Sequence, residues 1–189
     1  MNEWTSVRVA RRFVRVLGME ESAKTRIHRV IRNFVAKDIL RTEIDEDDGR
    51  GAMRFSDSEA AIALLLLPLA DLAVDARGLR DVAEALRKPD NYNDAPIIPG
   101  VVRPITSQIE RGIAAALEGT KVVLSIDLGW DLATSKISRN ANLFIGSRKR
   151  DPEAETVLND YERIAFANLA SITVPATALF NAFFSGQAD

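Results

Sequence analysis

Residues 18–44, GMEESAKTRIHRVIRNFVAKDILRTEI, carry the pattern that decides the fold of this chain. Apolar side chains recur there three or four residues apart, which is the spacing of one face of an α-helix. The stripe consists of Ile27, Val30, Ile31 and Phe34. The side chains left on the other faces are basic or polar: Lys24, Thr25, Arg26, His28, Arg29, Arg32 and Asn33. The pattern predicts a helix that begins at about residue 20 or 22, packs through its stripe and presents a basic surface.

A shorter helix is predicted directly before this one, and Gly18 is well placed to end it. Its apolar face is formed by Val9, Phe13, Val16 and Leu17. Four arginines fall largely off that face: Arg8, Arg11, Arg12 and Arg15. Two short helices joined by a turn of a few residues, the second rich in Arg, Thr, Asn and His, match a helix-turn-helix unit.

The residues after the second helix predict a β-hairpin. Residues 39–44 alternate like a strand, and residues 52–55 read as a return strand after a turn-rich loop. Ser56 or Asp57 can then cap a further helix, with Glu59 near the capping-box position. A helix-turn-helix followed by a hairpin is the winged-helix arrangement.

Charge is divided unevenly along the chain. The 25 basic and 27 acidic residues give a net charge of -2 over 189 residues. Residues 1–41 alone hold ten basic and four acidic residues, a net charge of +6, whereas residues 42–90 carry a net charge of -6. A basic end on a mildly acidic chain can bind polyanions locally while the protein stays soluble.

Several function classes are excluded by composition. The chain has no cysteine, which removes disulfides, thiolate metal sites and cysteine nucleophiles, and His28 is its only histidine. No Walker, Rossmann or nucleophile-elbow pattern occurs. We therefore expect no enzymatic activity, no cofactor and no metal. The longest apolar run, residues 60–70, is far shorter than the roughly 20 residues of a membrane span, so a cytoplasmic protein with no membrane segment is expected.

Two segments resemble the DNA-binding half of MerR-type transcriptional regulators. Residues 31–40, IRNFVAKDIL, are similar to a second-helix motif that reads roughly Leu-Arg-Tyr-Tyr, three variable residues, Gly-Leu-Leu. Arg32 falls on its arginine, and Phe34 falls on its second tyrosine. Residues 51–57, GAMRFSD, are similar to the Gly-Tyr-Arg-X-Tyr-Ser wing. The resemblance covers roughly residues 4–88.

The resemblance implies a homodimer on a pseudo-palindromic site in double-stranded DNA. The second helix would lie in the major groove, where an arginine fork suits guanine and an asparagine suits adenine, and the wing would lie against the backbone. Arg32 is then the leading contact. The residues expected beside it are Lys24, Thr25, Arg26, His28, Arg29 and Asn33, with Arg50 and Arg54 in the wing.

Three features depart from the family pattern. Asn33 replaces the first tyrosine, and Asp38 stands where glycine is usual. The wing is acidic, because it carries Glu43, Asp45, Glu46, Asp47 and Asp48. Phosphates repel such a run, so either its tip points away from DNA or the wing serves another partner.

The second half predicts an α+β module after a proline-rich linker at residues 89–104. A helix over 105–117 ends at Gly119, and a strand over 121–128 can pair with residues 142–146. A helix from residue 151 continues its apolar stripe to residue 169, and a last helix near 175–184 carries aromatic side chains that complete either a core or a dimer interface: Phe180, Phe183 and Phe184. Two acidic residues beside Trp130 are assigned to turns and caps rather than to a ligand: Asp127 and Asp131.

The predicted architecture is mainly α with small β elements. A MerR-like winged helix-turn-helix over residues 1–88 is followed by the linker 89–104 and by an α+β module over 105–189 for dimerisation or sensing, where a protein partner or a small effector could bind. The leading hypothesis is a homodimeric DNA-binding transcriptional regulator. The alternative is a protein-interaction adaptor on a winged-helix scaffold that does not use DNA, as the acidic wing suggests.

Overall fold

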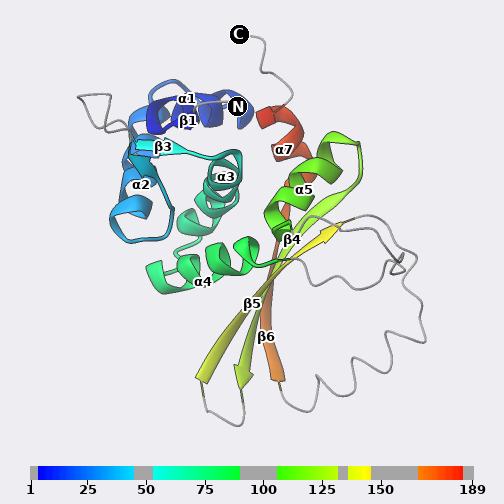
Figure 1. Ribbon diagram of the computed structural model, residues 1–189. Coiled ribbons are helices and arrows are strands. Elements are labelled where there is room, and N and C mark those ends of the chain that lie inside the picture. Colours follow the sequence, from blue (N-terminus) through cyan, green and yellow to red (C-terminus); the bar gives the residue numbers. More distant parts are fainter. Residues whose placement is uncertain (1–3, 45–52, 90–105, 132–135, 146–165, 185–189) are drawn as a thin grey trace.

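The computed structural model describes residues 4–44, 53–89, 106–131, 136–145 and 166–184. These residues are mainly helical, with two small three-stranded antiparallel sheets, which agrees with the predicted mixture of helices and small β elements. Figure 1 shows the helices gathered around one end of the longer sheet, while the other end of that sheet extends beyond them.

The N-terminal part begins with a short strand and two helices: β1 (Trp4–Thr5), α1 (Ser6–Val16) and α2 (Ala23–Ala36). Both predicted helices are confirmed. Thr5 caps α1, because its side chain accepts a hydrogen bond from the backbone N–H of Arg8. Gly18 follows α1 with a φ of +60°, a conformation that glycine adopts without strain, so it ends the helix as predicted.

The predicted hairpin consists of β2 (Glu43–Ile44) and β3 (Met53–Phe55), with β1 on the other side of β3. The prediction that residues 39–44 form one strand is wrong for its first half. Asp38 has a φ of +54°, and the backbone N–H of Ile39 donates to the carbonyl of Phe34. This end of α2 turns the chain back, so that Ile39 and Leu40 are buried under the helices before β2 begins.

Two further helices, α3 (Asp57–Asp71) and α4 (Ala76–Arg87), follow the hairpin. Ser56 caps α3 by accepting a hydrogen bond from the backbone N–H of Glu59. The Glu59 carboxylate accepts hydrogen bonds from the backbone of Arg41 and from the side chain of Arg87. Its role is therefore to join distant segments, in addition to its place in the first turn of α3.

The second half contributes α5 (Gln108–Leu117), β4 (Val122–Asp131), β5 (Lys136–Ile145), β6 (Phe166–Pro175) and α7 (Ala176–Phe184). The sheet order is β5-β4-β6, so β4 is central. The predicted alternation along β4 is confirmed, because Val122, Leu124 and Ile126 are buried while the residues between them are half-buried. Gly112 brings α5 so close to β5 that a Cβ atom would overlap the Leu143 side chain.

One predicted helix is wrong at its C-terminal end. Its apolar stripe was expected to run to residue 169, but residues 166–175 form strand β6 along the free edge of β4. The reason is visible in the last residues, where Val174 is buried and Thr173 is exposed, a strand alternation. The earlier part, residues 151–165, lies outside the described residues, as does the predicted linker beyond Pro89.

The ends of α1 and α3 allow a test of backbone conformation. Ala73 follows α3 with a φ of +60°, and an L side chain is disfavoured in this left-handed region by about 1–2 kcal/mol. We expect Ala73→Gly to raise the free energy of unfolding by about 0.5–1 kcal/mol. Glycine removes this strain, but part of the gain is offset because glycine loses more conformational entropy on folding. Urea denaturation measures the change. Gly18→Ala is the reverse control and should destabilise, so a destabilising Ala73→Gly would contradict the assignment.

Candidate nucleic-acid interface

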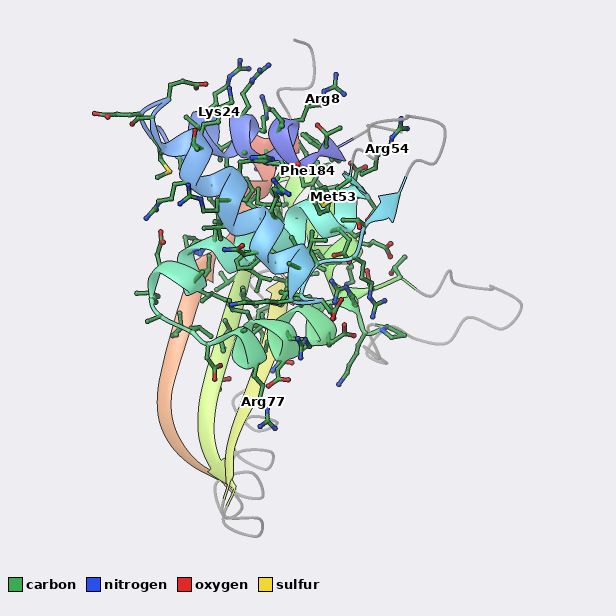
Figure 2. All side chains as sticks on the ribbon, turned by 90° about the vertical axis from the view of Figure 1, so that its left-hand side faces the viewer. Arg8, Lys24, Met53, Arg54, Arg77 and Phe184 are labelled. Atoms are coloured by element: carbon green, nitrogen blue, oxygen red, sulfur yellow. The ribbon has the colours of Figure 1, made fainter. Side chains whose placement is uncertain are left out.

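One side of α2 forms an exposed polar surface, which we call the α2 arc. Its members fall within an arc of about 120° on a helical projection. They are Thr25, Arg26, Arg29, Arg32 and Asn33, all of them exposed. Figure 2 views the molecule from the side on which α2 lies in front. The α2 arc therefore consists of polar side chains that are accessible to a binding partner.

The opposite side of α2 fixes the helix to the body. Ile27, Ile31 and Phe34 are at most 4% exposed and belong to the main apolar core. Burial of a side chain of this size contributes about 1.5–3 kcal/mol. Three such anchors, spaced along the helix, hold the α2 arc at a fixed orientation.

Most side chains of the α2 arc are not bonded to other described residues. The side chains of Thr25, Arg29, Arg32 and Asn33 form no hydrogen bond or ion pair with another residue that the structure describes. Arg26 instead makes an ion pair with Asp71, with 3.1 Å between Nη2 and Oδ2, in a setting where both side chains are more than half exposed. Exposed pairs of this kind stabilise by about 0–1 kcal/mol and exchange easily for another anion.

Lys24 lies just outside the arc, at the start of α2, where its Nζ is 2.9 Å from Oε1 of Glu21. The hydrogen bond and the charge of Lys24 lower the pKa of the Glu21 carboxyl below its ordinary value; burial acts in the opposite direction, and the charge of Arg11 adds a lesser lowering effect. The carboxylate is thus held in its charged form in a basic neighbourhood. A phosphate would compete with it for Lys24.

His28, a predicted contact, also lies outside the α2 arc. It is half-buried, and its Nε2 lies 3.1 Å from Oγ of Ser6, the buried first residue of α1. The side chain thereby joins α2 to α1. This partner could not be predicted from local sequence patterns, because the two residues are 22 positions apart.

The hairpin contributes one described basic residue of the predicted wing. Arg54 lies on β3, is half-buried and stands opposite Glu43 of β2 and Thr5 of β1 in the strand register. Figure 2 shows Arg54 beside Met53 at the edge of the molecule. The other predicted wing contact, Arg50, lies outside the described residues, as does the acidic run at residues 45–48.

A buried ion pair fixes the segment between α2 and the hairpin. Arg87 lies 2.7 Å from each oxygen of Glu59, through Nε and Nη2, and both side chains are only 10% exposed. Arg87 also donates to the carbonyl of Ile39, and the Glu59 carboxylate accepts from the backbone N–H of Arg41. Two neighbouring backbone groups of the connecting segment are therefore held by one pair of side chains.

The charge state of that pair follows from its surroundings. Burial acts to lower the pKa of the Arg87 guanidinium, but the hydrogen bond and charge of Glu59, followed by those of Glu84, outweigh it and raise the pKa above its ordinary value. Arg87 is therefore a permanent cation inside the fold. Glu84 bridges it to Arg41, with 2.7 Å to Arg87 Nη1 and 3.1 Å to Arg41 Nη2.

Three arginines of α1, which we call the α1 stripe, form a second basic surface that the predicted site left out. Arg8, Arg11 and Arg15 are exposed and follow one another at intervals of three and four residues, so they line one side of the helix. The fourth arginine, Arg12, is half-buried and donates at 2.9 Å to the carbonyls of Ala182 and Phe183 at the end of α7. The interval along the sequence could have identified the stripe, whereas the partner of Arg12 could not be foreseen.

The C-terminal aromatic side chains complete the core of the N-terminal part. The ring centroids of Trp4 and Phe183 lie 4.6 Å apart in a stacked pair, and Phe13 meets Phe183 edge to face at 5.7 Å. Of the two roles that the sequence left open, core formation is the one that the structure displays. Figure 2 shows Phe184 directly behind the N-terminal helices.

Among the described residues of the second half, we identify no ligand-binding or metal-binding site. The assignment of Asp127 to a turn or cap is wrong, because it lies within β4, where its carboxylate is 3.4 Å from Ser125 Oγ. Among the described residues no group of acidic or histidine side chains could hold a metal ion, and no described helix is long and apolar enough to cross a membrane.

Comparisons with protein-family models, with curated proteins and with solved structures found no match for this chain.

Proposed function

We propose that this protein is a sequence-specific DNA-binding transcriptional regulator whose helix α2 enters the major groove. The α2 arc carries the proposal. The major groove is about 12 Å wide and admits an α-helix, so side chains in a narrow outward arc reach base edges together. Arg29 and Arg32 supply guanidinium forks for guanine, and Asn33 can pair with adenine.

The order of elements supports a MerR-like winged helix-turn-helix. Two helices joined by a short turn are followed by the hairpin β2–β3 and by the helix pair α3–α4, and β1 pairs with the hairpin. Asp38 adds a local argument. It stands where the family has glycine, and its φ of +54° is a conformation that glycine favours. The residue type departs from the family motif, but this backbone conformation is compatible with the resemblance.

The proposal includes a homodimer. A regulator of this kind binds two half-sites, so the two copies of α2 are expected about 34 Å apart on one face of the dimer. Analytical ultracentrifugation of the full chain with and without a duplex checks this part. A 1:1 complex of one chain with one duplex would contradict it.

Arg32→Ala tests the groove contact. We expect the free energy of binding to weaken by about 1–3 kcal/mol on a duplex selected in vitro with the full chain, because one bidentate base contact is lost. The affinity for a mixed-sequence duplex should fall much less, since base readout contributes little there. Gel-shift titrations measure both.

Arg77→Ala is the matched control. Arg77 is exposed on α4, and Figure 2 shows it at the opposite side of the helical body from Arg8 and Lys24. It should leave both affinities unchanged. If Arg32→Ala behaved like this control on the selected duplex, Arg32 would have no role in reading the sequence.

A protein-interaction adaptor is the second candidate, because the sequence of residues 43–48 contains a run of acidic residues. The two functions differ in their response to salt. A DNA-binding protein loses affinity steeply as salt rises, because phosphate contacts release counterions. An anisotropy titration of the full chain on a mixed-sequence duplex at several KCl concentrations would show no such slope for an adaptor.

A further inference from the structure

We propose that the outer edge of β6 pairs with the same edge of a second copy of this chain, so that two long sheets join into one continuous sheet. The pairing surface is formed by residues 170–174, which we call the β6 edge. This inference deepens the homodimer of the proposed function, on which it rests for the kind of partner, and it names the interface.

The central strand β4 shows which backbone groups of β6 are already bonded. The N–H of Val122 donates to Oγ1 of Thr177 at 2.5 Å, and its carbonyl accepts from the same hydroxyl at 3.1 Å. Thr177 lies in the first turn of α7, directly after β6. Backbone groups of successive residues in a strand point alternately to its two sides. Val122 and then Leu124 therefore direct their backbone groups toward β6, where Leu124 stands opposite Val174.

The outward backbone groups of the β6 edge belong to Ser171 and Thr173. Val174 faces Leu124 across the ladder, and Ile172, two positions away, also directs its backbone groups toward β4. Alternation then turns the N–H and carbonyl groups of Ser171 and Thr173 away from β4. Among the described residues no strand lies on that side of β6, which both figures show as an outer strand of the long sheet. Such a row of N–H and carbonyl groups is a template for another strand.

The opposite edge of the sheet, along β5, is protected. The backbone N–H of Leu143 donates to Oε1 of Gln108 on α5, at 3.3 Å, so a side chain occupies an outward group of this strand. β5 also contains Lys136 and Arg139, and charged residues on an edge strand disfavour pairing with another chain. β6 contains no charged residue, and its only proline is its last residue, Pro175. An open edge on one side of the sheet favours a closed dimer over a growing row of copies.

The β6 edge is limited at both of its ends. The ladder to β4 shifts its register between Leu128 and Gly129, so that Leu169 is an extra residue in β6. A bulge of this kind bends the strand and interrupts pairing. At the other end, Pro175 has no N–H to donate. The segment between these limits has the usual length of a strand, and its short length restricts the possible registers.

Two antiparallel copies of the β6 edge match each other about a two-fold axis at Ile172. In this register Ser171 of one copy faces Thr173 of the other, and each such pair exchanges two backbone hydrogen bonds. Ile172 faces Ile172 of the other copy in a position without hydrogen bonds, where side chains approach most closely. Its side chain packs against the main core but is only half-buried. A second copy therefore satisfies the outward backbone groups, covers this apolar surface and brings no repelling charge.

Thr173→Pro tests the pairing. Proline removes the outward N–H of this exposed residue and leaves the ladder to β4 in place, as edge strands tolerate. Half of the backbone hydrogen bonds between the copies are lost by symmetry, so we expect the dissociation constant of the dimer to rise by about tenfold or more. Sedimentation velocity of the full chain over a wide range of concentrations measures this constant. Thr173→Val is the matched control, since valine has the same shape and keeps the N–H, and it should leave the constant unchanged.

Thr173→Lys supplies the result if the proline variant does not fold, which circular dichroism melting checks. Lysine keeps the backbone N–H but places like charges at diagonal positions across the two-fold axis. The dimer should therefore weaken, and added salt should restore part of its stability. Phe144→Lys adds the same charge at an exposed position of β5 and should leave the dimer unchanged.

A wild-type dimer that both Thr173→Pro and Thr173→Lys leave intact overturns the inference, while the proposed function stands with its copies joined elsewhere. A wild-type chain that is monomeric with and without a duplex overturns both the inference and the homodimer. Wild-type assemblies larger than a dimer also contradict the inference, because they require a second open edge. DNA binding is judged separately: a flat salt response of a dimer that Thr173→Pro dissociates contradicts the proposed function and leaves the β6 edge as the interface.

Discussion

Phe183→Ala is expected to lower the free energy of unfolding by about 3–5 kcal/mol, the range measured when a large aromatic core residue is truncated. Phe183 is fully buried and is the centre of an aromatic cluster. Its ring stacks on Trp4, and it meets Phe13 and Phe184 edge to face, with centroids 4.6, 5.7 and 5.0 Å away. Pairs of this kind add about 0.5–1.5 kcal/mol each beyond the area that they bury.

The effect should reach the N-terminal part of the chain, although the substituted residue is near the other end. The carbonyl of Phe183 also accepts a hydrogen bond from Arg12, so α7 and α1 are joined by packing and by a charged donor. Urea denaturation followed by circular dichroism and by tryptophan fluorescence should therefore give one shifted transition for both signals.

Phe144→Ala is the control for this experiment. Phe144 is 47% exposed on β5, so its loss should cost little, within about 1 kcal/mol. Phe183→Leu keeps most of the apolar volume and gives a measurable value if the alanine variant does not fold. Equal stability of Phe183→Ala and Phe144→Ala would show that α7 does not support the N-terminal core.

The helices of the N-terminal part could be predicted because their signals are local. The apolar stripe of α2, with Ile27, Ile31 and Phe34, repeats within four residues, and each of these side chains is buried. The exposed side of α2 follows from the same periodicity. The helix predicted up to residue 169 is wrong at residues 166–169 for the opposite reason, since strand β6 depends on partners in β4 that lie 35 to 52 positions away in sequence.

The candidate site shows the same division between local and distant causes. The exposure of Arg29 and Arg32 follows from their place on α2, whereas the contact of His28 with Ser6 depends on how two helices pack. Periodicity cannot distinguish Arg12 from its exposed neighbours, because the carbonyls that it binds lie 170 and 171 positions further along the chain. Sequence periodicity thus predicts which side of a helix is polar, whereas contacts between distant segments determine which residues, such as His28 and Arg12, bond within the fold.

The Glu59–Arg87 pair gives the second prediction with a large effect. Glu59→Ala is expected to lower the free energy of unfolding by about 3–5 kcal/mol, because it leaves the guanidinium of Arg87 buried without its partner. The backbone N–H of Arg41 loses its acceptor as well. Guanidinium chloride denaturation of the full chain measures the loss.

Glu84→Ala is the matched control, since Glu84 belongs to the same network but its side chain is 45% exposed. Solvent can replace it, so its removal should cost at most about 1 kcal/mol. The double variant Glu59→Leu, Arg87→Met should recover much of the stability lost in Glu59→Ala, because an apolar pair of similar size leaves no buried charge.

These three variants separate the cost of an unpaired charge from the value of the ion pair. If the double variant were as unstable as Glu59→Ala, the loss would come from the backbone groups, since Arg87 holds the carbonyl of Ile39 and Glu59 holds the N–H of Arg41. If Glu59→Ala lowered the free energy of unfolding as little as Glu84→Ala, the Glu59–Arg87 pair would be accessible to water. We expect Glu59→Ala to be severely destabilised and the double variant to recover most of the loss. This order follows only if the carboxylate of Glu59 neutralises a desolvated Arg87 between α2 and the hairpin.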